Sequence, residues 1–277
     1  MCRWLAYAGP SIEIGTLLFQ PTNSLARQSQ AARRTVYTTN GDGFGVGWYG
    51  DRPNPGLYRD ILPAWNDSNL RSLAEQIRSR LFLAHVRAST GTSVSRENCH
   101  PFRYGNWLFV HNGLIGGYRE LRARIDRMIA PELYQYRLGS TDSEAFFYML
   151  VGNGLAEDPT VAFGRTVGQI CDVIDEAAPG EPFHMAAVAT DGHRLIALRC
   201  SNDSNSPSLY YAQGAEIGVR EGRMHFSDGH GAVLVASEPL DHDDLGWTEV
   251  PDAHFLIAQG GSVTVVPLDS PHPAAAA

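Results

Sequence analysis

Runs of β-forming residues constrain the fold of this chain more than any other feature, because they come in two batches separated by helical patterns. Asp191 and Gly192 separate two of the later runs, and these residue types accept the positive φ angles of a tight hairpin turn. We therefore expect antiparallel pairing. The expected strands span residues 3–8, 44–49, 81–87, 107–111, 183–190, 194–200, 209–213, 232–237, 254–258 and 262–267.

Helical patterns lie between and before the two batches of strands. Within residues 118–129, the apolar side chains Leu121, Ile125, Met128 and Ile129 recur at helical spacing opposite a set of arginines, which predicts one buried face. Helices of this kind must cover a sheet, so the chain is expected to be α+β, with antiparallel sheets stacked on one another and helices outside. The expected helices span residues 68–79, 118–129, 141–151 and 160–177.

Composition narrows the class of protein. With 277 residues, 43% hydrophobic and 19% charged, the chain is typical of a soluble globular protein, and we expect a single domain over residues 1–268 with a disordered tail at 269–277. The net charge is -8 and the dense basic residues are confined to 119–127, which argues against a nucleic-acid partner. No run approaches the roughly 18 apolar residues of a membrane span, and the N-terminus carries Arg3 but lacks the apolar h-region expected of a signal peptide. A cytoplasmic location is expected.

The cysteines and histidines do not predict a metal site. The four cysteines are widely spread and lack CxxC spacing, which argues against a disulfide scaffold and a zinc ribbon. The Cys99-His100 pair invites a metal interpretation, but the remaining histidines show no ligand spacing to complete it. We expect no metal and no cofactor.

Cys2 is the first candidate nucleophile. Removal of Met1 would leave a thiol and a free α-amine on one carbon, so that a single residue supplies both nucleophile and base. The α-amino group titrates near pH 8, roughly two units below a lysine side chain, so a useful fraction is unprotonated at neutral pH. Position alone is a weak signal, because a small residue often follows an initiator methionine.

Polar residues follow two of the expected strands and open one helix. Arg87 ends the strand at 81–87, and Asn112 with Gly113 follows the strand at 107–111. Asp142 lies in the first turn of an expected helix, inside a capping pattern that runs from Thr141 to Glu144. A guanidinium and an amide at two strand ends predict a site.

Six parts of the first 150 residues form one pattern: Cys2 and residues 40–45 (NGDGFG), 85–90 (HVRAST), 98–101 (NCHP), 111–113 (HNG) and 140–144 (STDSE). Together they resemble the class II glutamine amidotransferases, whose fold is that of the N-terminal-nucleophile hydrolases. The later half, with residues 236–240 (ASEPL) and 247–251 (WTEVP), resembles a stand-alone subgroup that includes the ergothioneine-pathway γ-glutamyl hydrolase and the amidotransferase-like subunit of glutathione degradation.

The resemblance implies a four-layer αββα sandwich and a cysteine amidohydrolase. Cys2 would attack the γ-amide carbonyl of a glutamyl group and form a thioester, which water would resolve. The Asn112 side chain and the Gly113 backbone N–H would hold the developing oxyanion. The default interpretation of Asn-Gly between apolar runs is a turn.

The resemblance also implies that both charged ends of the glutamyl group are bound. Arg87 would pair with the α-carboxylate through its bidentate fork, and Asp142 would bind the α-ammonium. Thr90 is a further candidate contact to the carboxylate. Without the resemblance, Arg87 would be read as a surface ion pair and Asp142 as a helix cap. Gly91 stands where many relatives carry a histidine, which leaves the identity of the donor open.

Three functions therefore remain. In the first, the protein releases glutamate with ammonia or an amine from a small γ-glutamyl substrate; the ammonia then passes to a separate synthase, or the protein works with a peptidase subunit. In the second, it is a dedicated γ-glutamyl hydrolase of ergothioneine biosynthesis or glutathione-type degradation. In the third, it is a catalytically inactive binding or regulatory module that retains the fold.

Overall fold

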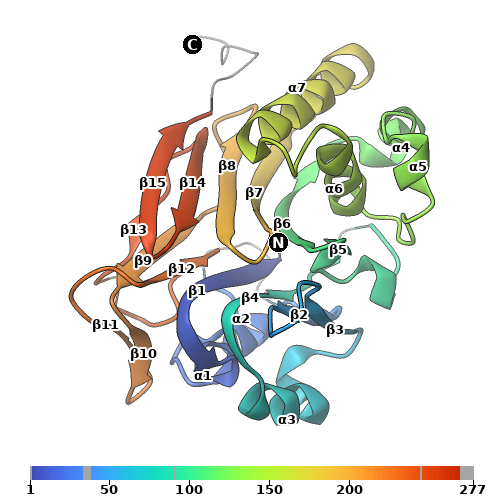
Figure 1. Cartoon of the computed structure of the whole chain (residues 1–277). Coiled ribbons are helices and arrows are strands. Elements are labelled where there is room, and N and C mark those ends of the chain that lie inside the picture. Colours follow the sequence, from blue (N-terminus) through green and yellow to red (C-terminus); the bar gives the residue numbers. More distant parts are fainter. Residues whose placement is uncertain (1, 34–38, 90, 244, 269–277) are drawn as a thin grey trace.

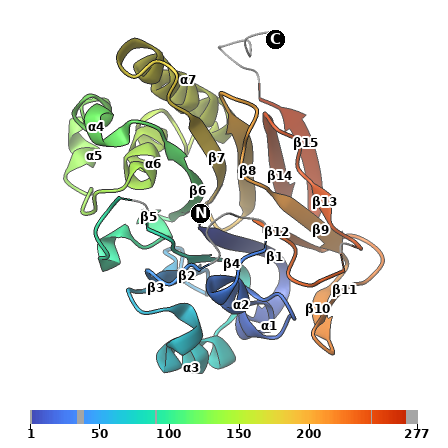
Figure 2. The same cartoon turned by 180° about the vertical axis from the view of Figure 1, so that it is seen from behind.

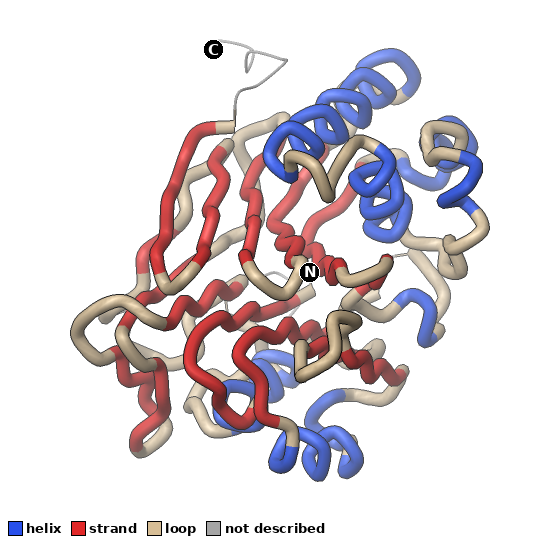
Figure 3. Tube along the Cα trace, in the orientation of Figure 1, coloured by secondary structure: helices blue, strands red, loops and turns tan. Residues whose placement is uncertain are grey.

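Two antiparallel sheets stacked face to face form the centre of the molecule, and helices cover both outer faces (Figure 1). The computed structural model describes residues 2–33, 39–89, 91–243 and 245–268. The same layers are visible from behind (Figure 2), and the strands run through the middle of the molecule with helices at its flanks (Figure 3). The expected α+β sandwich of αββα type is confirmed.

The first sheet has seven strands. They are β1 (Arg3–Glu13), β2 (Phe44–Trp48), β3 (Gly56–Asp60), β4 (Arg78–Val86), β9 (Tyr210–Gly214), β12 (Ala232–Ala236) and β13 (Thr248–Glu249). Their order across the sheet is β13-β9-β12-β1-β4-β2-β3. The central β1 pairs with β12 on one side and with β4 on the other, so both ends of the sequence contribute to the middle of this sheet.

The second sheet has six strands in the order β15-β14-β8-β7-β6-β5, and a separate hairpin joins two further strands. Asp191 and Gly192 form the tight connection between β7 and β8, as expected, and Gly192 has a φ of 93°. The strands are β5 (Phe102–Tyr104), β6 (Trp107–Ile115), β7 (Phe183–Thr190), β8 (Arg194–Ser201), β14 (His254–Gln259) and β15 (Ser262–Pro267), and the hairpin consists of β10 (Ile217–Arg220) and β11 (Arg223–Phe226).

Helices cover the outer face of each sheet. The first group is α1 (Gly15–Phe19), α2 (Leu25–Gln30) and α3 (Ser68–Gln76), with the short 3-10 turn η1 (Ala64–Asn66), and it lies against the seven-stranded sheet. The second group is α4 (Tyr118–Asp126), α5 (Pro131–Tyr134), α6 (Asp142–Gly152) and α7 (Pro159–Ala177), against the six-stranded sheet. Another 3-10 turn, η2 (Arg96–Asn98), precedes β5.

Alternation along the strands creates three apolar layers. In β6, Leu108 and Val110 are buried between the two sheets, whereas Phe109 packs under the helices of the second group. In β1, Trp4 and Ala6 likewise enter the layer between the sheets. Side chains at the even-numbered positions of β6, and of β1 as far as Ala8, therefore face the same inter-sheet layer.

Several expectations about local structure need correction. Met128 was expected on the buried face with Leu121 and Ile125, but the α-helix ends at Asp126 and Met128 is 37% exposed. The strand expected at 107–111 continues to Ile115, because β6 stays paired with β7 along its whole length. The helices α1, α2 and α5 and the strands β3, β5, β10, β11 and β13 were not expected.

In the part of the chain that the structure describes, no helix is both long enough and apolar enough to cross a bilayer. The tail expected to be disordered, residues 269–277, lies outside the described residues.

Candidate active site

Cys2 directly precedes the central strand β1, where Arg3 pairs with Val86 of β4. The Ala88 backbone N–H donates to the Cys2 Sγ at 3.5 Å, and the thiol in turn lies 3.6 Å from the Ala88 carbonyl oxygen. Burial raises the pKa of the Cys2 thiol, while the Ala88 hydrogen bond and the Arg87 charge lower it. The thiol is therefore held at the end of β4, next to Arg87.

A buried ion pair includes the side chain that holds the Cys2 backbone carbonyl in place. Arg3 donates through Nη1 to the Cys2 carbonyl oxygen at 2.8 Å and through Nε to Glu238 Oε2 at 3.0 Å. Both charged side chains are 1% exposed. Asn23 donates to the other Glu238 oxygen at 3.2 Å. Glu238 belongs to the ASEPL segment, so that segment meets the N-terminal strand in space.

Arg87 is a buried cation, and its hydrogen-bond partners among the described residues are neutral oxygens. Its guanidinium donates to the Thr92 hydroxyl at 2.7 Å, to the Ser89 hydroxyl and the Ser93 carbonyl at 3.2 Å, and to the Asp42 carbonyl at 3.4 Å. The residue is 3% exposed, and no carboxylate among the described residues forms an ion pair with it. A buried arginine normally requires an anion, so this site is suited to bind one.

Asp42 shapes the loop around Arg87. Its carboxylate accepts from the Ser89 backbone N–H at 2.7 Å, and its backbone pairs with that of Arg87. The sequence assigned no chemistry to the glycine-rich segment at residues 40–45. Gly43 is required there by close packing, because a Cβ would lie 2.5 Å from the Cys99 Sγ. Gly43 also has a φ of 119°, which favours glycine, and the part played by Asp42 was missed.

Asn112 and Gly113 lie inside β6, opposite Ala186 and Met185 of β7, so the turn interpretation of this pair is wrong. By alternation with Leu108 and Val110, the Asn112 side chain faces the inter-sheet layer, as does Cys2 by alternation with Trp4. Asn112 is 2% exposed, and its Oδ1 has no hydrogen-bond partner among the described residues. Its side-chain amide is therefore not fully used by the fold.

Gly113 is required by close packing of the two strands. A Cβ at this position would lie 1.9 Å from the His184 carbonyl oxygen and 2.6 Å from the His111 Nε2. The neighbouring His111 accepts or donates a hydrogen bond at Nδ1 with the Ser143 hydroxyl at 2.8 Å. The backbone that follows Asn112 is thus held closely against β7 and α6.

Asp142 begins α6 and ties this helix to β6. Its Oδ2 accepts from the Ile115 backbone N–H at 3.0 Å, and its Oδ1 accepts from the Ser143 N–H at 2.7 Å. The expected cap at Thr141 is confirmed, since its hydroxyl accepts from the Glu144 N–H at 3.2 Å. Glu144 does not complete a capping box, because its carboxylate instead accepts from Leu138 and Gly139. The Ser143 hydroxyl also donates to Oδ1 at 3.3 Å, so it is Oδ2 that retains lone-pair capacity for a further donor.

Arg87 and Asp142 both act on the Cys2 thiol. The Asp142 charge raises the pKa of this thiol and the Arg87 charge lowers it, so both lie within electrostatic reach of the same sulfur. Thr90 lies outside the described residues. The next residue, Gly91, has a φ of 79° and open space around its Cβ position, so this loop position uses a backbone conformation that suits glycine.

A stacked pair of buried histidines lies between the sheets near the site. The rings of His85 and His100 are 4.1 Å apart, and none of their ring nitrogens has a hydrogen-bond partner among the described residues. Burial lowers the pKa of His85 to about 3 and that of His100 well below its ordinary value, so both are neutral near pH 7. The described part of the chain contains no group of three or more His, Cys, Asp or Glu side chains arranged to hold a metal ion.

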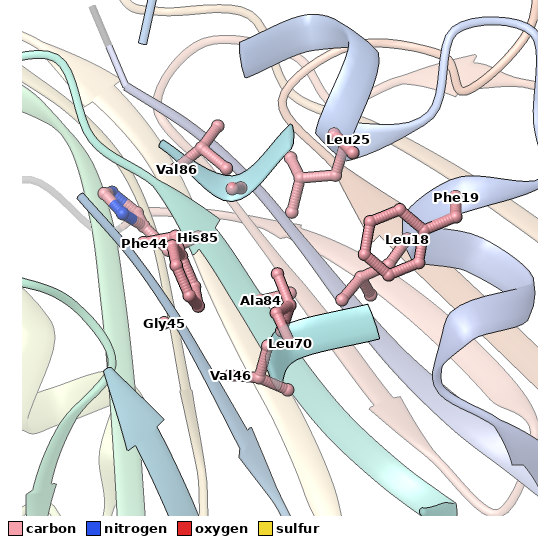
Figure 4. A pocket seen from close by; sticks show the side chains of 12 residues that line it. Leu18, Phe19, Leu25, Phe44, Gly45, Val46, Leu70, Ala84, His85 and Val86 are labelled. Atoms are coloured by element: carbon pink, nitrogen blue, oxygen red, sulfur yellow. The ribbon is translucent and has the colours of Figure 1, made fainter. Parts of the chain in front are cut away.

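An apolar pocket under the first helix group is separate from this site. Figure 4 shows it lined by Leu18, Leu25, Phe44 and other hydrocarbon side chains, with His85 at its edge. Its volume is about 10 Å³, which is too little for more than a single water. It carries no charged side chain and does not include Cys2, so we exclude it as the site of the chemistry.

Comparison with known proteins identifies the family. The family model for class II glutamine amidotransferases matches residues 19–277. This chain belongs to the class II glutamine amidotransferases. The resemblance found in the sequence is thereby confirmed, and the match includes Arg87, Asn112 and Asp142 but begins after Cys2.

Among relatives, the probable glutamine amidotransferase DUG3 of Saccharomyces cerevisiae is 33% identical, with 97% of this chain and 84% of that protein covered. The γ-glutamyl-hercynylcysteine sulfoxide hydrolase of Mycolicibacterium smegmatis is 30% identical, with 97% of this chain and 100% of that protein covered. A class II glutamine aminotransferase domain protein from Silicibacter pomeroyi has a TM-score of 0.70 at 32% identity, covering 96% of this chain and 99% of its own.

Proposed function

We propose that this amidotransferase-family protein is a cysteine amidohydrolase that cleaves a γ-glutamyl amide and releases glutamate with ammonia or an amine. The observation that carries the proposal is the buried Arg87 guanidinium, which has no carboxylate partner among the described residues and lies beside the Cys2 thiol. An α-carboxylate supplies the missing anion in bidentate geometry. Asp142, whose charge also acts on the thiol, supplies the countercharge for an α-ammonium.

Cys2 forms the covalent intermediate in this proposal. Its sulfur bonds to the γ-carbonyl carbon, and the carbonyl oxygen becomes an oxyanion held by the Asn112 amide and the Gly113 N–H. The C–N bond then breaks and the leaving amine takes up the proton that came from the thiol. Water attacks the thioester, the C–S bond breaks, a proton from the water passes to the sulfur and regenerates the thiol, and glutamate is released.

A base is needed because burial raises the pKa of the Cys2 thiol, which keeps it protonated at neutral pH. The buried histidines are poor candidates, since His85 and His100 make no hydrogen bond to the sulfur and their pKa values are strongly lowered. We therefore assign the base to the α-amine of Cys2 after removal of Met1. The chain needs no metal or cofactor for this mechanism.

Two donor classes follow from the relatives. One relative is named for γ-glutamyl-hercynylcysteine sulfoxide, and another is named a probable glutamine amidotransferase. Glutamine and γ-glutamyl-hercynylcysteine sulfoxide are both γ-glutamyl compounds, and they differ in the group that leaves on hydrolysis. We propose a small γ-glutamyl compound as donor, either with direct release of the amine or with a separate synthase or peptidase subunit, in the cytoplasm.

The test compares two cysteines. Cys2→Ala is expected to abolish glutamate release from γ-glutamyl amides, whereas Cys99→Ala should retain it, because Cys99 is buried against the Asp60 and Ser95 carbonyls. Intact mass of the active protein should show that Met1 is absent, and acid quenching should trap a glutamyl adduct on Cys2. Full activity in protein that retains Met1 would exclude the α-amine as base. Labelling of Cys2 without glutamate release from any donor would instead support a binding module.

A further inference from the structure

One buried amide connects the two loops that hold Arg87 and Asp142. Asn98 ends the turn η2 and is 1% exposed. Its Nδ2 donates to the Ser93 carbonyl oxygen at 2.9 Å, and its Oδ1 accepts from the Ser140 backbone N–H at 2.8 Å. The amide has only one orientation that satisfies both neighbours, since a carbonyl oxygen only accepts and a backbone N–H only donates.

The Ser93 side of this bridge leads directly to Arg87. The same Ser93 carbonyl oxygen accepts from the Arg87 guanidinium at 3.2 Å, so Asn98 and Arg87 share one acceptor. Arg87 also bonds to the hydroxyls of Ser89 and Thr92 in the same loop. The position of the Ser93 carbonyl therefore helps to determine where the Arg87 guanidinium lies.

The Ser140 side leads to Asp142, two residues further along the chain. The intervening Thr141 caps α6, which leaves little freedom between Ser140 and the Asp142 carboxylate. Packing on this side is close, because a Cβ on Gly139 would lie 2.5 Å from the Asn98 Oδ1. Asn98 also donates to the Ser140 hydroxyl at 3.2 Å.

We propose that Asn98 is a positioning residue that sets the separation between the carboxylate-binding Arg87 and the ammonium-binding Asp142. This inference rests on the proposed function, since it assumes that these two residues hold the charged ends of one glutamyl group. Asn98 touches neither the substrate nor the thiol, and it acts through Ser93 and Ser140. Its role is to make the site selective for an amino acid over molecules with only one of the two charges.

The experiment measures binding of three small acids by calorimetry. L-Glutamate is the common product of every γ-glutamyl donor and carries both charged groups; glutarate lacks the α-amine, and 4-aminobutanoate lacks the α-carboxylate. Wild-type protein should bind L-glutamate more tightly than either analogue. In Asn98→Ala, the Kd for L-glutamate should rise about tenfold to a hundredfold, because misplacement of one loop removes simultaneous engagement of both charges.

The two analogues separate positioning from general damage. Each engages one loop only, so its Kd should change little in Asn98→Ala. Asn98→Asp keeps the size of the residue and an acceptor for Ser140 but places a carboxylate oxygen against the Ser93 carbonyl. This variant should weaken L-glutamate and glutarate, which use Arg87, and leave 4-aminobutanoate unaffected. It also keeps the proposal testable if Asn98→Ala does not fold.

Asn153→Ala is the matched control. The Asn153 amide also bridges two segments, since it donates from the end of α6 to Thr166 and Gln169 of α7, away from the site. This variant should lower the melting temperature without changing any Kd. Equal weakening of all three acids in the Asn98 variants, or an unchanged Kd for L-glutamate, would overturn the inference. If wild-type protein itself does not prefer L-glutamate, the recognition part of the proposed function fails and this inference fails with it.

Discussion

At the scale of single residues, Asn112 shows how a strand position is kept available for chemistry. It lies within a fully paired stretch of β6, and its Oδ1 has no hydrogen-bond partner among the described residues. A buried amide that the fold leaves partly unused costs stability, and such a cost is common where a ligand supplies the missing partner. The unpaired Oδ1 is an acceptor and would take a donor, whereas the oxyanion of the proposed intermediate would accept a hydrogen bond from the Nδ2 of the same amide.

Asn112→Ala is expected to lower kcat for γ-glutamyl amide hydrolysis about 100-fold to 1000-fold, because one preorganised oxyanion donor is lost. KM should change little, since the oxyanion exists only after attack. Asn106→Ala is the control: this asparagine lies between β5 and β6 and donates to the Asp191 carbonyl at 3.2 Å, outside the site. A loss confined to KM, or an equal loss in both variants, would remove Asn112 from the oxyanion role.

At the scale of elements, the ion pair between Arg3 and Glu238 joins the first residues of β1 to the segment after β12. Two hydrogen bonds reinforce this connection: the Ser237 backbone N–H donates to the Trp4 carbonyl, and the Trp4 backbone N–H donates to the Ser237 hydroxyl. Because Arg3 also holds the Cys2 carbonyl, the placement of the nucleophile depends on a segment far away in the sequence.

Glu238→Gln is expected to lower the free energy of unfolding by about 3–5 kcal/mol, because it leaves the Arg3 charge buried without its carboxylate. Urea denaturation measures the change. The matched variant is Glu13→Gln, whose partner Arg78 is 59% exposed, and such a surface pair contributes about 0–1 kcal/mol. If the two variants lose the same free energy of unfolding, the buried pair does not stabilise β1 more than a surface pair does.

At the scale of the whole molecule, two sheets enclose ionisable groups that must remain neutral. His85 and His100 stack between the sheets without hydrogen-bond partners for their ring nitrogens in the described structure. In the unfolded chain a histidine titrates near pH 6.5, whereas burial lowers the pKa of His85 to about 3 in the folded protein. Between these values the unfolded state binds a proton that the folded state does not.

The free energy of unfolding should therefore be highest above about pH 6.5 and fall as the pH drops toward 3, by up to about 1.4 kcal/mol per pH unit for each such histidine. Urea titrations from pH 8 to pH 4.5 measure this slope. His85→Phe should make the slope shallower by about one proton. A slope that does not respond to His85→Phe would contradict this account.

The sequence alone determined the layers of this protein and supplied most of the candidate site residues. Strand β7 has the expected bounds, because its run of apolar residues is clearly delimited by a turn signal. Cys2, Arg87 and Asp142 were found because each lies at an element end, where the motif and the local pattern agree. Local signals of this kind depend only on neighbours along the chain.

Tertiary structure decided what no local pattern contains. Asn112 and Gly113 have the composition of a turn, yet pairing with β7 keeps them in a strand, since a ladder of backbone hydrogen bonds outweighs the preference of one dipeptide. The lack of a carboxylate partner for Arg87, the bridge through Asn98 and the pairing of Arg3 with Glu238 all join residues whose contact depends on how the sheets and loops stack. Such contacts form only when the chain is folded. Burial then excludes competing water, which strengthens each hydrogen bond and makes an unpaired polar group costly.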